Sequence, residues 1–173
     1  VSGNTFNPAS GTQTVTYTVG TAPCVETLAQ IITVVPDVDP AWTNPSPICA
    51  SAGSINLNTL ITGTAGGTWS GTGVSGNTFN PASGTQTVTY TVGTAPCVET
   101  LAQIITVNPD VNPAWTNPSP ICASAGSINL NTLITGTAGG TWSGTGVSGT
   151  TFNPASGTQT VTYTVGTAPC VET

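Results

Sequence analysis

Apolar and polar residues alternate along several short stretches of this chain. The clearest is Thr85–Val92, where the even-numbered residues from Val88 are apolar and the odd-numbered ones are threonine. This alternation predicts a strand with one buried and one solvated face. We expect Leu101–Val107 to pair with it across a turn at Gly93–Cys97. Further short strands are predicted at Ser54–Ile61, Thr68–Ser70 and Val74–Asn80, and no stretch has the period of an amphipathic helix.

The same pattern returns every 73 residues. Residues 74–146 differ from residues 1–73 at two positions only, where Asn108 replaces Val35 and Asn112 replaces Asp39. Residues 147–173 repeat the first 27 residues with Thr150 in place of Asn77 and Asn4. A unit of this length with six or seven short strands is typical of a small antiparallel β-sandwich.

The sequence therefore predicts an all-β chain of tandem immunoglobulin-like antiparallel β-sandwich domains. Pro-rich stretches at Val35–Pro47 and Asn108–Pro120 suggest linkers with boundaries near Pro36 and Pro109. We expect residues 1–35 to be the C-terminal half of one repeat and residues 36–108 to be a complete repeat. Residues 109–173 are expected to form a repeat that lacks its last strand.

The large aromatic residues of the strands are the expected core of each repeat. They recur at the same place in the period, and the predicted core residues are Trp69, Phe79, Tyr90, Trp142, Phe152 and Tyr163. Because a domain of this size buries little apolar area, we expect it to need cross-links or support from its neighbours.

Charge is nearly absent from the chain, which excludes several functions. There is no Lys, Arg or His, and 3% of the residues are charged. Nucleic-acid binding needs basic residues to neutralise phosphates. Catalysis by a His general base or a Lys Schiff base is impossible here, and the acids are too sparse within a repeat to supply a close general acid/base pair. No apolar run approaches the ~20 residues that cross a bilayer. We therefore expect no enzyme, no cofactor, no nucleic-acid partner and no direct membrane insertion.

The five cysteines follow the repeat, with two in each full unit. No C-x-x-C pair and no His accompany them, so structural disulfides in an oxidising compartment are the preferred interpretation. The pairing within repeats, Cys49–Cys97 and Cys122–Cys170, is the first choice. In a standard immunoglobulin topology these positions lie at opposite ends, so Cys49–Cys170 between neighbouring repeats is the alternative. Cys24 is expected to have its partner outside the sequence.

Two further groups of residues have candidate roles. Trp42 and Trp115 follow Pro-rich turns, and they are expected either to pack where two repeats meet or to stack on sugars. Asp37, Asp39 and Asp110 are weak candidates for calcium ligands, because Ca²⁺ prefers clustered oxygen ligands. Asn112 in place of the second acid removes charge from the second linker.

The runs PSPICASAGSINLNTLITGTAGGTWSGTGVSGNTFNPASGTQTVTYTV and GTAPCVETLAQIITV resemble immunoglobulin-like repeats of very large Bacteroidota cell-surface proteins. That group includes gliding-motility adhesins and surface filaments, usually exported by the type IX secretion system. The resemblance implies an extracellular stalk or filament of tandem β-sandwiches.

The leading hypothesis is thus a structural or adhesive repeat array at the cell surface. Its expected partners are other copies of itself or neighbouring repeats. Two alternatives are an array of carbohydrate-binding modules that recognises surface glycans through Trp42 and Trp115, and a set of spacer domains of a secreted hydrolase.

Overall fold

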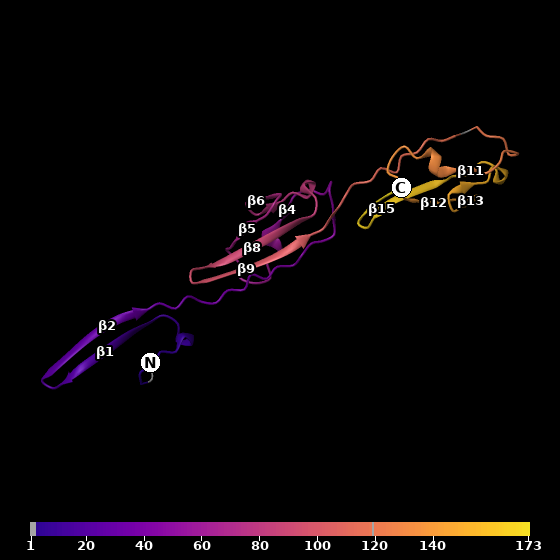
Figure 1. The fold of residues 1–173 in the computed structure, drawn as a ribbon. Helices are drawn as coiled ribbons and strands as arrows, with labels where there is room; N and C mark the ends of the chain where they lie inside the picture. Colours follow the sequence, from indigo (N-terminus) through magenta and orange to yellow (C-terminus); the bar gives the residue numbers. More distant parts are fainter. Residues whose placement is uncertain (1–2, 119) are drawn as a thin grey trace.

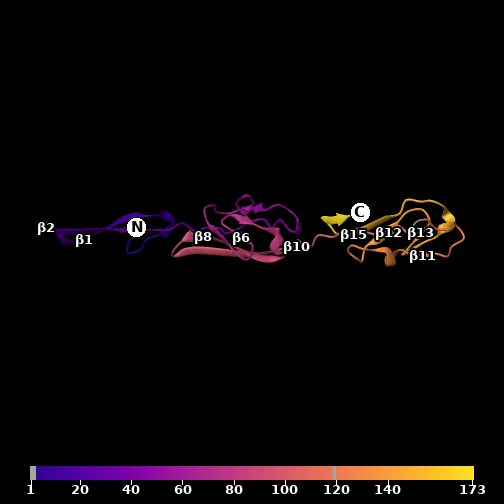
Figure 2. The ribbon, with the colours of Figure 1, turned by 90° about the horizontal axis from the view of Figure 1, so that it is seen from above.

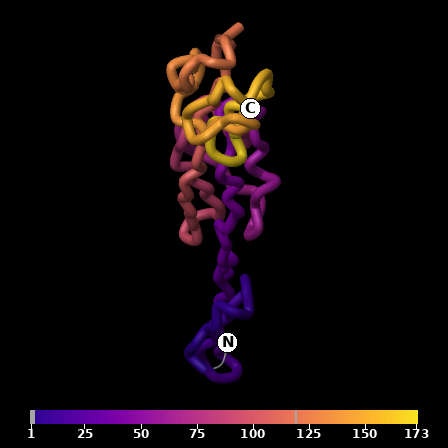
Figure 3. The backbone as a smooth tube through the Cα atoms, turned by 90° about the vertical axis from the view of Figure 1, so that its right-hand side faces the viewer, coloured from indigo at the N-terminus to yellow at the C-terminus, as the bar shows by residue number. Residues whose placement is uncertain are grey.

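The computed structural model describes residues 3–118 and 120–173. Every element in this part of the chain is a strand or a 3-10 helix of three or four residues, so the prediction of an all-β chain is confirmed. Three sections follow one another in a row: an N-terminal segment (residues 1–35), a middle repeat (36–108) and a third repeat (109–173) (Figure 1). Figure 2 shows the same row from above, and Figure 3 traces it from the N-terminal hairpin upward.

The middle repeat contains two antiparallel sheets of three strands and one parallel pair. The sheets have the strand orders β5-β8-β9 and β4-β7-β6, while β10 runs parallel to β3. The elements are β3 (Ile48–Cys49), β4 (Ile55–Asn56), η2 (Leu57–Leu60), β5 (Thr68–Ser70), β6 (Val74–Ser75), β7 (Thr78–Phe79), η3 (Pro81–Ser83), β8 (Gln86–Thr94), β9 (Cys97–Ile105) and β10 (Val107–Asn108).

The third repeat has the same two sheets, with the orders β12-β15-β16 and β11-β14-β13. Its elements are β11 (Ile128–Asn129), η4 (Leu130–Leu133), β12 (Thr141–Ser143), β13 (Val147–Ser148), β14 (Thr151–Phe152), η5 (Pro154–Ser156), β15 (Thr162–Thr167) and β16 (Cys170–Glu172). The N-terminal segment contains η1 (Pro8–Ser10) and one hairpin, β1 (Gln13–Thr21) with β2 (Cys24–Ile32).

Stacked aromatic rings form the centre of each core. In the middle repeat Trp69 lies edge-on to Trp42, with 5.2 Å between ring centroids, and 4.5 Å from the ring of Tyr90. The third repeat has the same stack with centroid separations of 5.2 and 4.6 Å. Buried around these rings are the apolar side chains of both sheets. The six aromatic residues expected in the core are all buried.

Polar atoms inside this core have local partners. The Tyr90 hydroxyl accepts a hydrogen bond from the Gly67 amide and donates one to the Thr64 carbonyl oxygen, both at 2.9 Å. The Trp69 indole donates to the Asn58 side-chain oxygen at 2.8 Å. These bonds tie the loop between β4 and β5 to the sheet, because a buried donor or acceptor without a partner is costly.

Two predicted strands differ from the structure. The stretch Val74–Asn80 forms two short antiparallel strands, β6 and β7, because the chain turns between them at Gly76, which has a φ of +58°. The alternation over Ser54–Ile61 continues as a strand only to Asn56, and Leu57–Leu60 forms the 3-10 helix η2. The Asn56 side chain accepts a hydrogen bond from the Asn58 amide at 3.1 Å, which caps this turn. An asparagine side chain can bond to the nearby main chain in this way instead of leaving it to form strand hydrogen bonds. The alternation of apolar residues gives no indication of this competition.

Candidate functional site at the junction between repeats

The most distinctive local structure is the tip of the long hairpin in each section. Gly166 allows the tip of β15–β16 with a φ of +110°, and a Cβ there would collide with the Cys170 carbonyl oxygen. Gly93 and Gly20 have the same role in the other two hairpins. Each tip points toward the N-terminal end of the molecule, so the tip of one repeat faces the section before it (Figure 1).

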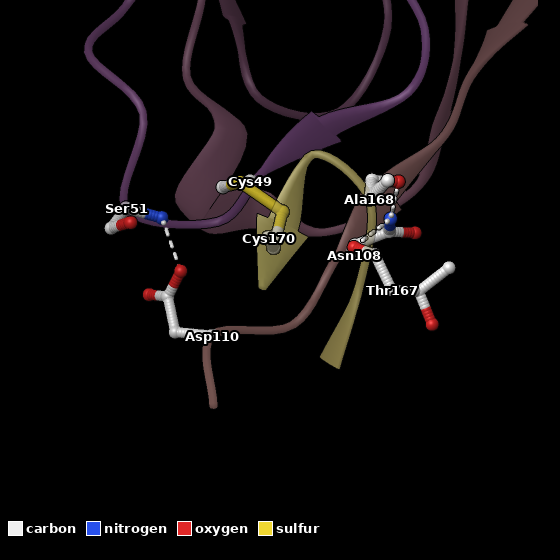
Figure 4. Close-up of a disulfide and its surroundings, with 7 residues drawn as sticks. All are labelled: Cys49, Ser51, Asn108, Asp110, Thr167, Ala168 and Cys170. Atoms are coloured by element: carbon white, nitrogen blue, oxygen red, sulfur yellow. Dashed lines mark hydrogen bonds between the residues drawn. A yellow bond between two sulfur atoms is a disulfide. The ribbon is translucent and has the colours of Figure 1, made fainter. Parts of the chain in front are cut away.

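A disulfide joins the third repeat to the middle repeat at this place. Cys170 at the tip of β15–β16 is bonded to Cys49 of β3, and their Cα atoms lie 5.5 Å apart (Figure 4). That separation is within the range that a disulfide allows. The preferred pairing within repeats, Cys49–Cys97 and Cys122–Cys170, is wrong: Cys97 and Cys122 are free thiols. The alternative pairing between repeats is the one formed.

The length of the hairpin explains this outcome. Cys97 begins β9 at the tip of the hairpin. Cys49 is the β-strand partner of Asn108 in β10, eleven residues after Cys97 and at the other end of the hairpin. Eleven residues of extended chain span roughly 35 Å, which no disulfide can bridge. The tip of the following repeat comes to Cys49 instead, because all hairpins point the same way.

Polar contacts surround the disulfide. The Asn108 side-chain amide donates to the carbonyl oxygens of Thr167 and Ala168 at 3.3 and 3.1 Å. The Ser51 amide donates to a carboxylate oxygen of Asp110 at 3.1 Å (Figure 4). Val111 lies against the tip at Gly166. These contacts hold the segment from Asn108 to Val111, which leads out of the middle repeat, beside the Cys49–Cys170 disulfide.

The junction between the N-terminal segment and the middle repeat has part of this arrangement but no disulfide, because Cys97 is a free thiol. Cys97 lies beside Val35, with its sulfur 3.7 Å from the Val35 carbonyl oxygen, and Val38 lies against Gly93. Val35 stands where the next junction has Asn108, so this junction lacks the side-chain amide that holds the tip. Sequence reasoning gave Asn108 no role, although it is one of only two positions at which the first two periods differ.

The second difference has no such effect. Asp39 and Asn112 both use a side-chain oxygen to accept a hydrogen bond from the amide two residues later, at 3.0 Å in each case. Asparagine and aspartate both supply this acceptor. The exchange of a carboxylate for an amide therefore leaves the local turn unchanged.

The free cysteines fall into two classes by their place in the period. Cys24 and Cys97 occupy the hairpin-tip position of Cys170, and Cys122 occupies the position of Cys49. Cys24 and Cys122 are exposed, and Cys97 is partly buried. None of the three has a cysteine of this sequence at the 121-residue separation that Cys49 and Cys170 show.

The candidate calcium ligands do not converge. Among the described residues there is no group of three or more His, Cys, Asp or Glu side chains arranged to hold a metal ion. Asp39 caps its own turn and Asp110 caps the Ser51 amide of the preceding repeat. These acids are turn and junction residues in the structure.

Both expectations for Trp42 are wrong. Its ring is buried inside the middle repeat rather than at a joint between repeats, and no face is open for a sugar. The indole donates to the Leu101 carbonyl oxygen at 3.3 Å, which fixes the start of the repeat against β9. Trp115 makes the same ring stack but is only partly buried. The residues expected to be linker after Pro40 are therefore part of the repeat.

No family model, no curated protein and no solved structure matches the chain. Within the described residues, no helix is long and apolar enough to cross a bilayer.

Proposed function

We propose that the chain is a structural repeat array of an extracellular, cell-surface protein, in which immunoglobulin-like β-sandwich repeats are joined into a stalk or filament. The observation that carries this proposal is the disulfide between repeats, Cys49–Cys170. A disulfide between neighbouring repeats joins them into one array, which is a structural role and not a role in a catalytic or binding site of a single repeat.

The redox chemistry supports a location outside the cytoplasm. Structural disulfides persist in oxidising compartments and are rare where thiol buffers keep cysteines reduced. In the chain-entropy model, a bond that closes 121 residues restricts the unfolded chain by about 5 kcal/mol. A thin core of this kind gains much of its stability from such a restriction.

The position of the disulfide also determines how the array carries tension. Residues 50–169 lie between the two bonded cysteines, so a pull on the two ends passes through the sulfur bridge instead of through this stretch. Both sheets of the middle repeat from β4 onward and most of the third repeat are protected from stretching. A stalk exposed to shear outside a cell needs this property.

Single-molecule force spectroscopy on the 173-residue chain tests the mechanical part. The oxidised chain is expected to release no length from residues 50–169 at any force that leaves the disulfide intact. Reduction, or the variant Cys49→Ser, should add about 400 Å of contour length, at roughly 3.5 Å per residue over 121 residues. Equal contour lengths in both states would refute the structural role assigned to the bond.

Surface labelling tests the location. Antibodies against the repeat should stain intact producing cells as strongly as permeabilised ones. Staining that requires permeabilisation would contradict the proposal.

A further inference from the structure

The long hairpin of the middle repeat has a second face that the core does not use. Val88, Tyr90 and Val92 of β8 are buried in the core, so the threonines between them project from the opposite side of the sheet. Paired residues of neighbouring strands project from the same side, and the strand pairing therefore places these threonines in rows. One row consists of Thr68, Thr91 and Thr100, the next of Ser70, Thr89 and Ala102, and a third of Thr87 and Ile104. Together with Val98, the residues of these rows are the outer face.

The outer face holds both of the large hydrophobic side chains that the middle repeat leaves exposed. Among residues 36–108, all of which the structure describes, these are Val98 and Ile104, which are 45% and 58% exposed. They lie near the two ends of β9, with Thr100 and Ala102 between them on the same side. Single apolar residues scattered over a surface have no special meaning. Here, however, two of them flank rows of threonine methyl groups and hydroxyls on one side of one sheet.

Charge is absent from the outer face, although the chain has a net charge of −6. Glu99 is the one acid in the sheet β5-β8-β9, and it pairs with the buried Val92, so it projects from the opposite side. Asp37 and Asp39 precede β3 and are not part of the sheet. Two copies of the chain can therefore approach through their outer faces with the least repulsion. A charged partner would lose the hydration of its charges here and gain no ion pair, so the surface favours a second copy of itself.

The third repeat has the same rows in its sheet β12-β15-β16. Thr141 pairs with Thr164, and Ser143 pairs with Thr162. Tyr163, between the two threonines of β15, is buried, so the threonines project from the other side of the sheet. Thr162 is exposed. The outer face therefore recurs with the period of the sequence and is not a peculiarity of one repeat.

The size of the outer face determines how strongly one repeat can bind. In the middle repeat β8 and β9 have nine residues each and β5 has three. At about 3.3 Å per residue and about 4.8 Å between strands, they form a surface of roughly 350 Å². Stable complexes bury about 800 Å² on each partner, so one pair of outer faces is a weak contact and several repeats have to engage. Cys49–Cys170 supports this, because it holds the outer faces of two repeats in one fixed arrangement.

We propose that the outer faces of separate copies of this chain pack on each other, so that arrays associate side by side. This deepens the proposed structural role and rests on it. Contact between two identical surfaces has a two-fold axis, and a threonine hydroxyl both donates and accepts, so identical rows can form hydrogen bonds with each other. Sheets that pack face to face lie about 10 Å apart, which removes Val98 and Ile104 of both copies from water.

Two alanines of the middle repeat provide a matched test. Ala102 lies on the outer face and Ala82 lies in η3, outside the sheet, and both are exposed. By sedimentation velocity over a concentration series, Ala102→Asp should raise the dissociation constant at least about tenfold, because the contact buries an unpaired charge. Ala82→Asp adds the same charge elsewhere, and Ala102→Thr keeps the outer face neutral, so both should associate as the unaltered chain does. Circular dichroism checks that each variant is folded.

Thr162→Asp places a charge on the outer face of the third repeat and tests whether both repeats contribute. It should weaken association by itself, and further in combination with Ala102→Asp. Added salt should strengthen association of the unaltered chain, since salt screens the repulsion between two copies with a net charge of −6 each.

Four results would overturn the side-by-side association but not the proposed function. They are equal effects of Ala102→Asp and Ala82→Asp, no effect of Thr162→Asp, dissociation on adding salt, and a chain that stays monomeric up to about 1 mM with Cys49–Cys170 intact. Absence of Cys49–Cys170 itself would overturn the proposed function.

Discussion

The side-chain amide of Asn108 donates to the carbonyl oxygen of Ala168, 60 residues further along the chain, at 3.1 Å. The contact joins the last strand of one repeat to the hairpin tip of the next, directly beside the disulfide. At the preceding junction Val35 occupies this position, and its side chain has no hydrogen-bond donor. The second junction therefore has a side-chain contact that the first lacks, in addition to the Cys49–Cys170 disulfide.

Asn108→Val should weaken the second junction, because it removes the two hydrogen bonds that the side-chain amide donates to the hairpin tip. Because the contact is exposed, we expect a loss of at most about 1 kcal/mol, or up to about fivefold in the equilibrium constant for forming Cys49–Cys170 against glutathione. The measurement is a redox titration with thiol trapping. Asn112→Asp is the control, because the acceptor at this position is retained; an equal effect of the two changes would contradict the role of Asn108.

Counting thiols discriminates between the two disulfide schemes. The pairing between repeats leaves Cys24, Cys97 and Cys122 free, so the unreduced monomer should take up three maleimide groups in denaturant, detected as a mass increase. Pairing within repeats would leave Cys24 alone and give one group. After reduction, both schemes predict five.

Tyr90→Phe should destabilise the middle repeat, because the Gly67 amide and the Thr64 carbonyl oxygen lose a buried partner. A cost of about 1–3 kcal/mol is expected in denaturant unfolding. Tyr163→Phe removes the same two bonds in the third repeat and should have a similar effect there. Tyr17→Phe is the matched control, since Tyr17 is 69% exposed; a loss of stability from this change as large as that from Tyr90→Phe would argue against the hydrogen bonds as the cause.

Gly166→Ala should disrupt the hairpin tip, since the new Cβ collides with the Cys170 carbonyl oxygen and the residue has a positive φ. We expect the Cys49–Cys170 disulfide to form more slowly and less completely during refolding. Peptide mapping under non-reducing conditions at successive times measures this. Gly149→Ala also introduces a Cβ at positive φ, but nothing lies within 4 Å of it. If both variants form the bond equally well, the tip geometry does not control it.

Much of the secondary structure can be read from the sequence. The alternation over Thr85–Val92 predicted the strand that β8 forms, and Thr68–Ser70 coincides with β5. Strands of this kind follow from the requirement that one face be buried. The pattern failed where Asn56 turns the chain, because a local side-chain hydrogen bond competes with the ladder.

The sequence by itself determined the period of 73 residues, the all-β character, the aromatic core and the number of thiols per repeat, because each depends on residue type and local spacing. Only the tertiary structure decided which thiols meet and where Trp42 lies. Those outcomes depend on the length and direction of a hairpin that carries Cys97 away from Cys49 and brings Cys170 of the following repeat to it. Contacts between residues more than 100 positions apart are a property of the packed chain, and no local pattern encodes them.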